Sequence, residues 1–202
     1  MALEINLDVT KAGNYQGLLN NYSPPIPQLL ELLITNLQIK EDKFKAQLYL
    51  GDARTTIQEL SQQNFLADAI FLDPFSPPRC PQLWTVEFLQ QLASCCAEDG
   101  KIATYSCAAA VRTALIAAGF KIGRTAQVGG RLPGTVGSFS NNDLLSLSKR
   151  SQEHLQTRAA VPYRDPQLNH CKKTILQQRL IEQQTSSLEP SSRWQKRWSK
   201  FK

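Results

Sequence analysis

The sequence predicts an α/β fold followed by a basic helical extension. Short apolar runs of strand length alternate with stretches whose apolar residues recur at helical spacing. Acidic residues stand directly after several of the apolar runs. From residue 149 the composition becomes basic: residues 149–202 hold 12 Lys and Arg against 4 Asp and Glu, whereas residues 1–148 hold 11 and 13. Such alternation is typical of a largely parallel sheet with helices on both faces.

Each predicted strand is a short apolar run that ends at a turn or an acidic residue. The expected strands are Ala46–Leu50, Ala67–Asp73, Lys101–Ser106 and Phe120–Arg124, and Met1–Ile5 resembles the end of an earlier strand that stops at Glu4. Asp99-Gly100 predicts a turn directly before the strand Lys101–Ser106. In parallel sheets ligands bind at the carboxyl ends of the strands, where Glu4, Asp52 and Asp73 stand.

The predicted helices follow from apolar residues at helical spacing and from start and stop residues. They are expected at Gln28–Leu37, Arg54–Gln63, Pro81–Ala97, Ala108–Ala118, Ser151–Ala160 and Asn169–Gln184. Proline is tolerated in the first turn of the third helix, and Gly119 stops the fourth. Residues 6–27 are rich in Asn, Gly and Pro and predict an irregular segment. Arg158–Pro166 predicts a compact joint between the last two helices.

The composition excludes several classes of protein. No apolar run approaches the length that spans a bilayer, and the first residues lack a signal pattern, so a cytoplasmic protein is expected. The five cysteines are an odd number without a C-x-x-C spacing. We expect reduced, mostly buried thiols and no metal site.

The basic extension has two interpretations that the sequence leaves open. A local excess of positive charge favours contact with a polyanion such as RNA, but it is equally typical of a solvated surface. Its last segment interleaves Trp194 and Trp198 with Lys and Arg. Residues four apart share one helix face, so the two rings could pack on the domain instead of stacking on bases.

Two segments carry residues suited to ligand chemistry. Gly51-Asp52-Ala53 closes a strand, where a carboxylate can accept a hydrogen bond from an adenine amino group or can cap the following helix. The loop from Asp73 to Trp84 contains four prolines, which lower the entropic cost of a fixed loop shape. A rigid loop with an acid and aromatic rings suits a planar substrate that bears an amine. The alternative is a capped loop with Trp84 as core filler.

These segments resemble a known family. GDA at 51–53, FLDPFSPPRCPQLWT at 71–85 and KIATYSCAAAVRTALIAAGF at 101–120 are similar to the MnmC-like methyltransferase domain family. This is the methyltransferase domain of the bifunctional tRNA 5-methylaminomethyl-2-thiouridine biosynthesis protein. LQTRAAVPYRDP and TSSLEPSSRWQKRW in the extension resemble its single-domain cyanobacterial-type members.

The resemblance implies a Rossmann-like fold and N-methylation of the aminomethyl group on the wobble uridine of tRNA, with S-adenosyl-L-methionine as cofactor. A separate FAD-dependent oxidase acting on the same nucleoside is a further implied partner. Asp73 matches the acid at the methyl-transfer site. The residues that match the family's cofactor-binding positions are Glu4, Gly51, Asp52 and Ala53. The residues expected to contact the substrate are Phe75, Trp84, Arg158, Tyr163 and Arg164.

The same comparison predicts a gap in the sheet. The family binds the methionine part of the cofactor with a glycine-rich loop after its first strand, whereas Gly13 and Gly17 follow no predicted strand. We therefore expect a chain truncated at its amino terminus, whose sheet lacks the first strand between the second and the fourth. The expected domains are a partial methyltransferase domain, 1–148, and a basic extension, 149–202. The alternatives are a non-catalytic RNA-binding protein and a non-functional fragment of such an enzyme.

Overall fold

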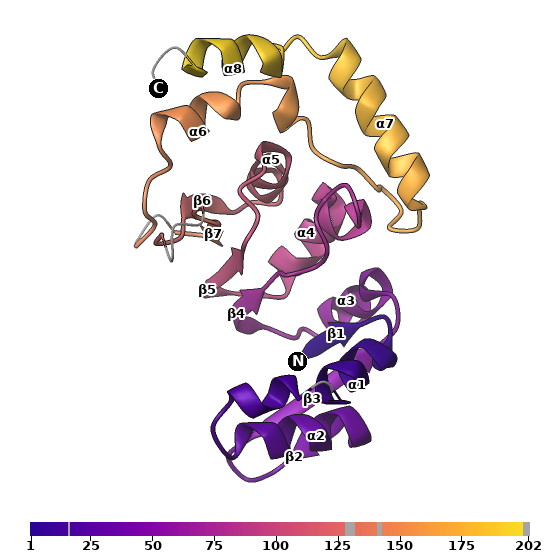
Figure 1. Cartoon of the computed structure of the whole chain (residues 1–202). Helices are drawn as coiled ribbons and strands as arrows, with labels where there is room; N and C mark the ends of the chain where they lie inside the picture. Colours follow the sequence, from indigo (N-terminus) through magenta and orange to yellow (C-terminus); the bar gives the residue numbers. More distant parts are fainter. Residues whose placement is uncertain (16, 128–131, 141–142, 200–202) are drawn as a thin grey trace. The chain divides into compact units, whose positions relative to one another are not determined.

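The computed structural model describes residues 1–15, 17–127, 132–140 and 143–199. It divides into two compact units, Met1–Glu59 and Leu60–Lys202, and each unit is described by itself (Figure 1). This division separates the first strands from the rest of the predicted methyltransferase domain. The boundary expected between residues 148 and 149 stays a prediction.

The first unit contains a sheet of three strands in the order β1-β3-β2. Strand β1 (Ala2–Glu4) runs parallel to β3 (Lys45–Leu50), and β2 (Gln38–Lys40) runs antiparallel to it. Glu4 pairs with Leu50, so both parallel strands end at the same edge. The backbone N–H of Gly51 donates to the carbonyl of Glu4 at 2.9 Å and extends this pairing by one residue.

Helices of the first unit follow β1 and β3 and precede β2. They are α1 (Leu7–Tyr15), α2 (Ile26–Asn36) and the start of α3 (Ala53–Gln62), with a short 3-10 turn η1 (Leu18–Asn21). The expectation that residues 6–27 are irregular was wrong because α1 and η1 lie there. Asn6 Oδ1 accepts the N–H of Asp8 at 2.9 Å, so a side-chain cap starts α1 where apolar periodicity is weak.

The second unit contains a mixed sheet in the order β4-β5-β7-β6. Strand β4 (Ala67–Phe71) runs parallel to β5 (Cys96–Thr104), whereas β7 (Thr135–Ser138) is antiparallel to β5 and to β6 (Lys121–Arg124). The α/β class is confirmed, but the prediction of a largely parallel sheet was wrong. After β6 the chain turns back and inserts β7 between β6 and β5, and the short polar sequence TVGS carried no strand signal.

Strand β5 passes straight through Asp99 and Gly100, where the sequence predicted a turn. The register between β4 and β5 shifts between Ala67 and Ala69, so the extra residues are absorbed by an irregularity within the pairing. A Cβ on Gly100 would lie 2.8 Å from the carbonyl oxygen of Ala67. The glycine is there because two backbones approach closely and not because the chain reverses.

The helix expected at Pro81–Ala97 consists of two pieces. A 3-10 turn η2 (Pro81–Trp84) is followed by α4 (Val86–Ser94). Between them Thr85 has extended backbone, and its hydroxyl accepts the N–H of Phe88 at 3.3 Å as the cap of α4. The break lets the loop and the helix take different directions.

Helix α5 (Ala109–Ala117) confirms the prediction at Ala108–Ala118 and packs beside α4 (Figure 1). Leu89, Val111 and Leu115 are fully buried in this packing. Each buried side chain of this size contributes about 1.5–3 kcal/mol to folding. Gly119 ends the helix at φ 101°, a backbone conformation that favours glycine.

The extension contains α6 (Lys149–His154), a 3-10 turn η3 (Arg158–Ala160), α7 (Lys172–Thr185) and α8 (Ser191–Ser199). The helix expected at Ser151–Ala160 is split, because the chain leaves the α-helix after His154. Trp194 of α8 is only 6% exposed, and its ring stacks on His154 at a centroid distance of 4.2 Å. Of the two interpretations of these tryptophans, packing on the protein describes Trp194.

No helix in the described ranges has the length and apolar character needed to cross a membrane. The five cysteines are free thiols, of which Cys95 and Cys96 are buried and Cys171 is exposed. Burial raises the pKa of the Cys95 and Cys96 thiols. The expectation of mostly buried cysteines therefore describes only these two.

Candidate functional site

The proline-rich loop leaves the carboxyl end of β4. Leu72 continues the strand pairing by donating its N–H to the carbonyl of Ala103 at 2.9 Å. The next residue, Asp73, is exposed, and the ring of Phe75 is 70% exposed. The loop therefore presents a carboxylate and an aromatic face to solvent, directly after a parallel strand.

Two aromatic side chains hold the backbone of this loop. The indole N–H of Trp84 donates to the carbonyl of Phe75 at 2.9 Å, and the hydroxyl of Tyr105 donates to the carbonyl of Pro74 at 2.9 Å. The two rings pack edge to face at a centroid distance of 6.0 Å. These two rings fix consecutive carbonyl groups of the loop, while the side chains of Asp73 and Phe75 are exposed.

The charges around the loop favour this arrangement. Partial burial raises the pKa of Tyr105, and the negative charge of nearby Asp73 raises it further. The hydroxyl therefore stays protonated near neutral pH and keeps its donor role. The guanidinium of Arg79 lies 5.5 Å from the centroid of the Phe75 ring, a distance at which the cation and the ring attract each other.

Trp84 is fully buried, so it shapes the loop from inside. Its role as a contact of the substrate stays a prediction. Tyr105 is 50% exposed and was not among the candidate residues. Its place near the end of the predicted strand Lys101–Ser106 was a usable signal for its position, but not for its partner. Tyr105 is the residue that sequence reasoning missed at this site.

A buried arginine fixes the backbone next to Tyr105. The Arg112 guanidinium donates to Thr135 Oγ1 at 3.0 Å, and Thr135 Oγ1 donates to the carbonyl of Ser106 at 2.7 Å. Burial lowers the pKa of Arg112. This chain of hydrogen bonds ties α5 and β7 to the carboxyl end of β5, from which Tyr105 reaches the loop.

The residues expected to bind the cofactor lie together in the first unit. The half-buried Glu4 accepts the backbone N–H groups of Ile5 and Asn6 with one oxygen, Oε1, at 2.8 and 3.0 Å. Gly51 has φ 135°, and a Cβ built on it would meet no atom within 4 Å. Ala53 begins α3. A carboxylate therefore lies at the end of β1, beside open space at the end of β3.

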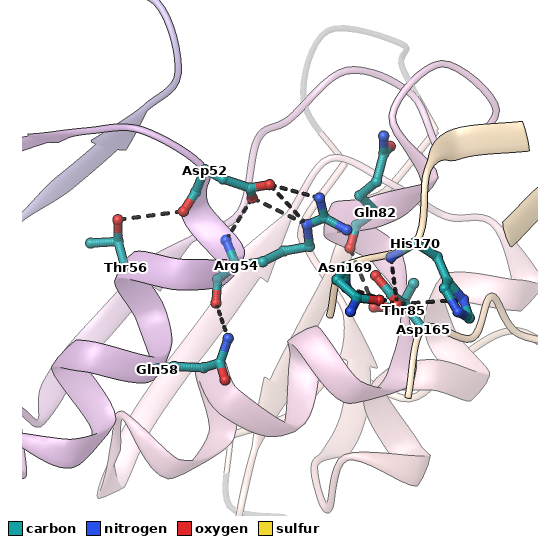
Figure 2. A network of polar contacts seen from close by, with 9 residues as sticks. All are labelled: Asp52, Arg54, Thr56, Gln58, Gln82, Thr85, Asp165, Asn169 and His170. Atoms are coloured by element: carbon teal, nitrogen blue, oxygen red, sulfur yellow. Dashed lines mark hydrogen bonds and ion pairs between the residues drawn. The ribbon is translucent and has the colours of Figure 1, made fainter. Parts of the chain in front are cut away.

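Asp52 makes two kinds of contact with Arg54 (Figure 2). Its carboxylate accepts the backbone N–H of Arg54 at 2.9 Å, the contact of a helix cap. It also forms an ion pair with the Arg54 guanidinium at 2.6 Å. The hydrogen bond from the Arg54 side chain is the main reason that the pKa of Asp52 is lowered. The capping interpretation of Asp52 thus describes its contacts.

The three substrate candidates of the extension have partners within the protein. Arg158 donates to the carbonyl of Leu188 at 3.3 Å. Tyr163 is 4% exposed under the guanidinium of Arg179, which lies 4.4 Å from the ring centroid. Arg164 forms an ion pair with Glu87 at 3.5 Å. The ion pair of Arg164 ties the extension to α4, whereas the contacts of Arg158 and Tyr163 lie within the extension. Contact with substrate stays a prediction for all three.

A second carboxylate anchors the same segment. Asp165 is fully buried and accepts the backbone N–H groups of Asn169 and His170, each at 3.1 Å (Figure 2). Its own N–H donates to Glu87 Oε2 at 2.7 Å. The candidate residues thus form separate clusters: Glu4 to Ala53 in the first unit, and the Asp73 loop and the extension in the second. In the described ranges no three His, Cys, Asp or Glu side chains gather to hold a metal ion.

Known proteins resemble this chain in sequence and in structure. It is 44% identical over 75 residues to the tRNA 5-methylaminomethyl-2-thiouridine biosynthesis bifunctional protein MnmC of Paracidovorax citrulli, covering 37% of this chain and 11% of that protein. An uncharacterized protein of Methanocaldococcus jannaschii is 30% identical over 145 residues, 71% of this chain and 40% of its own length.

The crystal structure of MNMC2 from Aquifex aeolicus superposes with a TM-score of 0.72 at 30% identity, over 82% of this chain and 54% of that one. The chain thus spans little more than half of this solved structure and a smaller share of the two sequence relatives. A family model described as S-adenosyl-L-methionine-dependent methyltransferase matches residues 14–140. The match includes β3 and the Asp73 loop, and on it the chain belongs to this methyltransferase family.

Proposed function

We propose that this protein methylates the nitrogen of an aminomethyl group on the wobble uridine of tRNA, with S-adenosylmethionine as the methyl donor. The observation that carries the proposal is the exposed Asp73 carboxylate, on a loop held by Trp84 and Tyr105, in a chain of this methyltransferase family. The name of the Paracidovorax citrulli relative supports the substrate class. A tRNA-modifying role follows from the same likeness.

Asp73 suits an amine substrate because a nitrogen nucleophile must present its lone pair while its N–H groups remain hydrogen-bonded. A carboxylate accepts such a bond, orients the amine and can take the proton that the nitrogen loses. The exposed ring of Phe75 offers a flat apolar surface for the base. A loop held at two carbonyls keeps both groups in place, and positioning of this kind supplies a large share of the rate enhancement.

Part of the cofactor fits the first unit. Glu4 Oε2 has no hydrogen bond in the described ranges and could accept the ribose hydroxyls, and the space beside Gly51 could admit a flat ring. When bound, the cofactor would supply the methyl group. Asp52 could contact adenine only if its ion pair with Arg54 opened. Of the described residues, none forms a glycine-rich loop after a strand, so the methionine part has no assigned residues.

The experiment that tests the function follows a labelled methyl group. The protein would be incubated with methyl-labelled S-adenosylmethionine and tRNA that carries an aminomethyl group on its wobble uridine. Nucleoside analysis should then show the label in that nucleoside and none in tRNA that lacks the aminomethyl group. Labelling at any other nucleoside, or none in either tRNA, would overturn the proposal. A separate FAD-dependent oxidase would be one source of the amine.

A second candidate function is non-catalytic binding of RNA. One observation favours it: the Asp52 carboxylate is engaged by Arg54 and is not open to the adenine end of a cofactor. Isothermal titration with S-adenosylmethionine separates the two candidates. Measurable binding that Glu4→Gln weakens and Asp8→Asn leaves unchanged would support the enzyme. tRNA binding without any heat from the cofactor would favour the binding protein.

A further inference from the structure

Helices α6 and α8 lie side by side in the extension (Figure 1). The guanidinium of Arg150 in α6 lies 5.4 Å from the ring centroid of Trp194 in α8. One turn further along, the indole N–H of Trp198 donates to Glu153 at 2.8 Å. The backbone N–H of Arg158, just after α6, donates to the carbonyl of Glu189, just before α8, at 2.9 Å, so the two helices run in opposite directions and form one layer.

The aromatic side chains of α8 are used inside this layer. The buried ring of Trp194 contacts both His154 and Arg150, and Trp198 is half-buried against Glu153. Base stacking requires an open ring face, which Trp194 does not offer. If this layer binds RNA, it binds through charge.

The acidic groups of the layer are neutralised internally. Arg197 forms ion pairs with Glu153 at 3.1 Å and with Glu189 at 2.6 Å. Glu153 is the single acid within α6 and α8. The outward charge of the layer is therefore set by its remaining cations.

Four exposed cations remain on the layer, and we call them the α6–α8 basic face. They are Lys149, Arg150, Arg193 and Lys196. In the described part of the extension the ion pairs use Arg164, His170 and Arg197, and none uses a residue of this face. Cations without carboxylate partners, on helices that are fixed by packing, can bind phosphates without first breaking an ion pair.

The basic face lies near the strand ends that carry the candidate site in the second unit. The turn η3, which follows α6, packs on α5, and Arg112 of α5 bonds to Thr135. Thr135 pairs with Thr104, the last residue of β5, directly before Tyr105. An RNA held by α6 and α8 would therefore lie at the end of the sheet where Asp73 is exposed.

From this geometry we infer that the α6–α8 basic face binds the phosphate backbone of the RNA substrate and so delivers the target nucleoside to the Asp73 loop. The identity of the RNA as tRNA rests on the proposed function. The binding mode itself rests on the layer: the buried ring of Trp194, internally paired acids and exposed cations without carboxylate partners.

The test compares two double variants with equal change in charge. Arg193→Gln with Lys196→Gln alters the basic face, and Lys172→Gln with Lys173→Gln alters two exposed cations of α7. Binding of transcribed tRNA would be measured over a series of salt concentrations. Loss of two phosphate contacts should lower the slope of log K against log salt by about 1.5, and the affinity near 0.1 M salt by roughly 30-fold. The α7 variant should leave the slope unchanged and should alter the affinity by less than about twofold.

Equal losses in the two variants would overturn the inference, because net charge alone would then explain the binding. So would unchanged tRNA affinity of the α8 variant together with lost binding to phosphatidylglycerol vesicles, which would assign the face to a membrane surface. Methyl transfer separates this inference from the proposed function. A local loss of tRNA affinity, in a protein that transfers no methyl group, supports the basic face and overturns only the enzymatic proposal.

Discussion

Trp84→Phe tests whether the buried indole holds the candidate loop. Trp84 is fully buried, and its N–H donates to the carbonyl of Phe75 at 2.9 Å. The smaller ring removes this donor, which costs about 1 kcal/mol. It also leaves a void that costs about 1–2 kcal/mol, since tryptophan fills more volume than phenylalanine. We expect the free energy of unfolding to fall by about 2–3 kcal/mol in total.

Trp194→Phe is the matched control. Trp194 is 6% exposed, so the loss of volume is similar, but its buried Nε1 has no hydrogen-bond partner in the described ranges. Removing an unpaired buried donor recovers about 1 kcal/mol or more of desolvation cost, which offsets much of the void. The two variants should therefore differ by about 2 kcal/mol in the free energy of unfolding.

Urea unfolding followed by far-ultraviolet circular dichroism measures this difference without relying on tryptophan fluorescence. For a chain of this size the slope is about 2 kcal/mol per molar urea, so the unfolding midpoints of the variants should lie about 1 M apart. Equal midpoints would refute the reasoning, because the hydrogen bond from Trp84 would then contribute nothing to stability. A lower midpoint for Trp194→Phe would refute it as well.

Two further predictions concern the sheet and the extension. Gly134→Ala should lower the free energy of unfolding by roughly 2 kcal/mol or more, because a Cβ would clash with the carbonyl oxygen of Thr104; an unchanged urea midpoint would contradict this. The second depends on pH. The Trp198 indole, and then Arg197, hold the pKa of Glu153 below its ordinary 4.5. Its contribution to stability is therefore complete above that value and is lost as the pH falls through the lowered pKa. Tryptophan emission should report the loosening of α8 in this acid range, and Glu153→Gln should remove the transition; a transition that persists in this variant would count against the assignment.

The sequence predicted those elements whose signal is local. Helix α5 was predicted within one residue at each end because alanine-rich helical spacing and a terminal glycine act within the helix itself. Strand β7 was missed because its four residues become a strand only by pairing with β5 and β6. The predicted turn at Gly100 was wrong for a related reason. The glycine is required by the close approach of the carbonyl of Ala67, a residue far away in the sequence.

The candidate site shows the same limit. Asp73 and its proline-rich loop were predicted as a candidate site from composition and position, because the prolines and the acid that suggest it belong to one short segment. The role of Tyr105 could not be predicted from one segment. Its hydroxyl donates to the carbonyl of Pro74, 31 residues earlier, and only the sheet brings the two residues together. For Asp52 both roles were foreseen, and the nearby Arg54 decides which one the structure shows.

The central claim is that Asp73 acts at the methyl-transfer site. It is tested most directly by the rate of methyl transfer to aminomethyl-bearing tRNA for Asp73→Asn, with Asp68→Asn as control. Asp68 is an exposed carboxylate of β4, five residues earlier in the chain. The account predicts that Asp73→Asn lowers the rate at saturating substrate by roughly 100-fold or more, with tRNA affinity unchanged, and that Asp68→Asn lowers neither. Equal rates for Asp73→Asn and the wild type would contradict it.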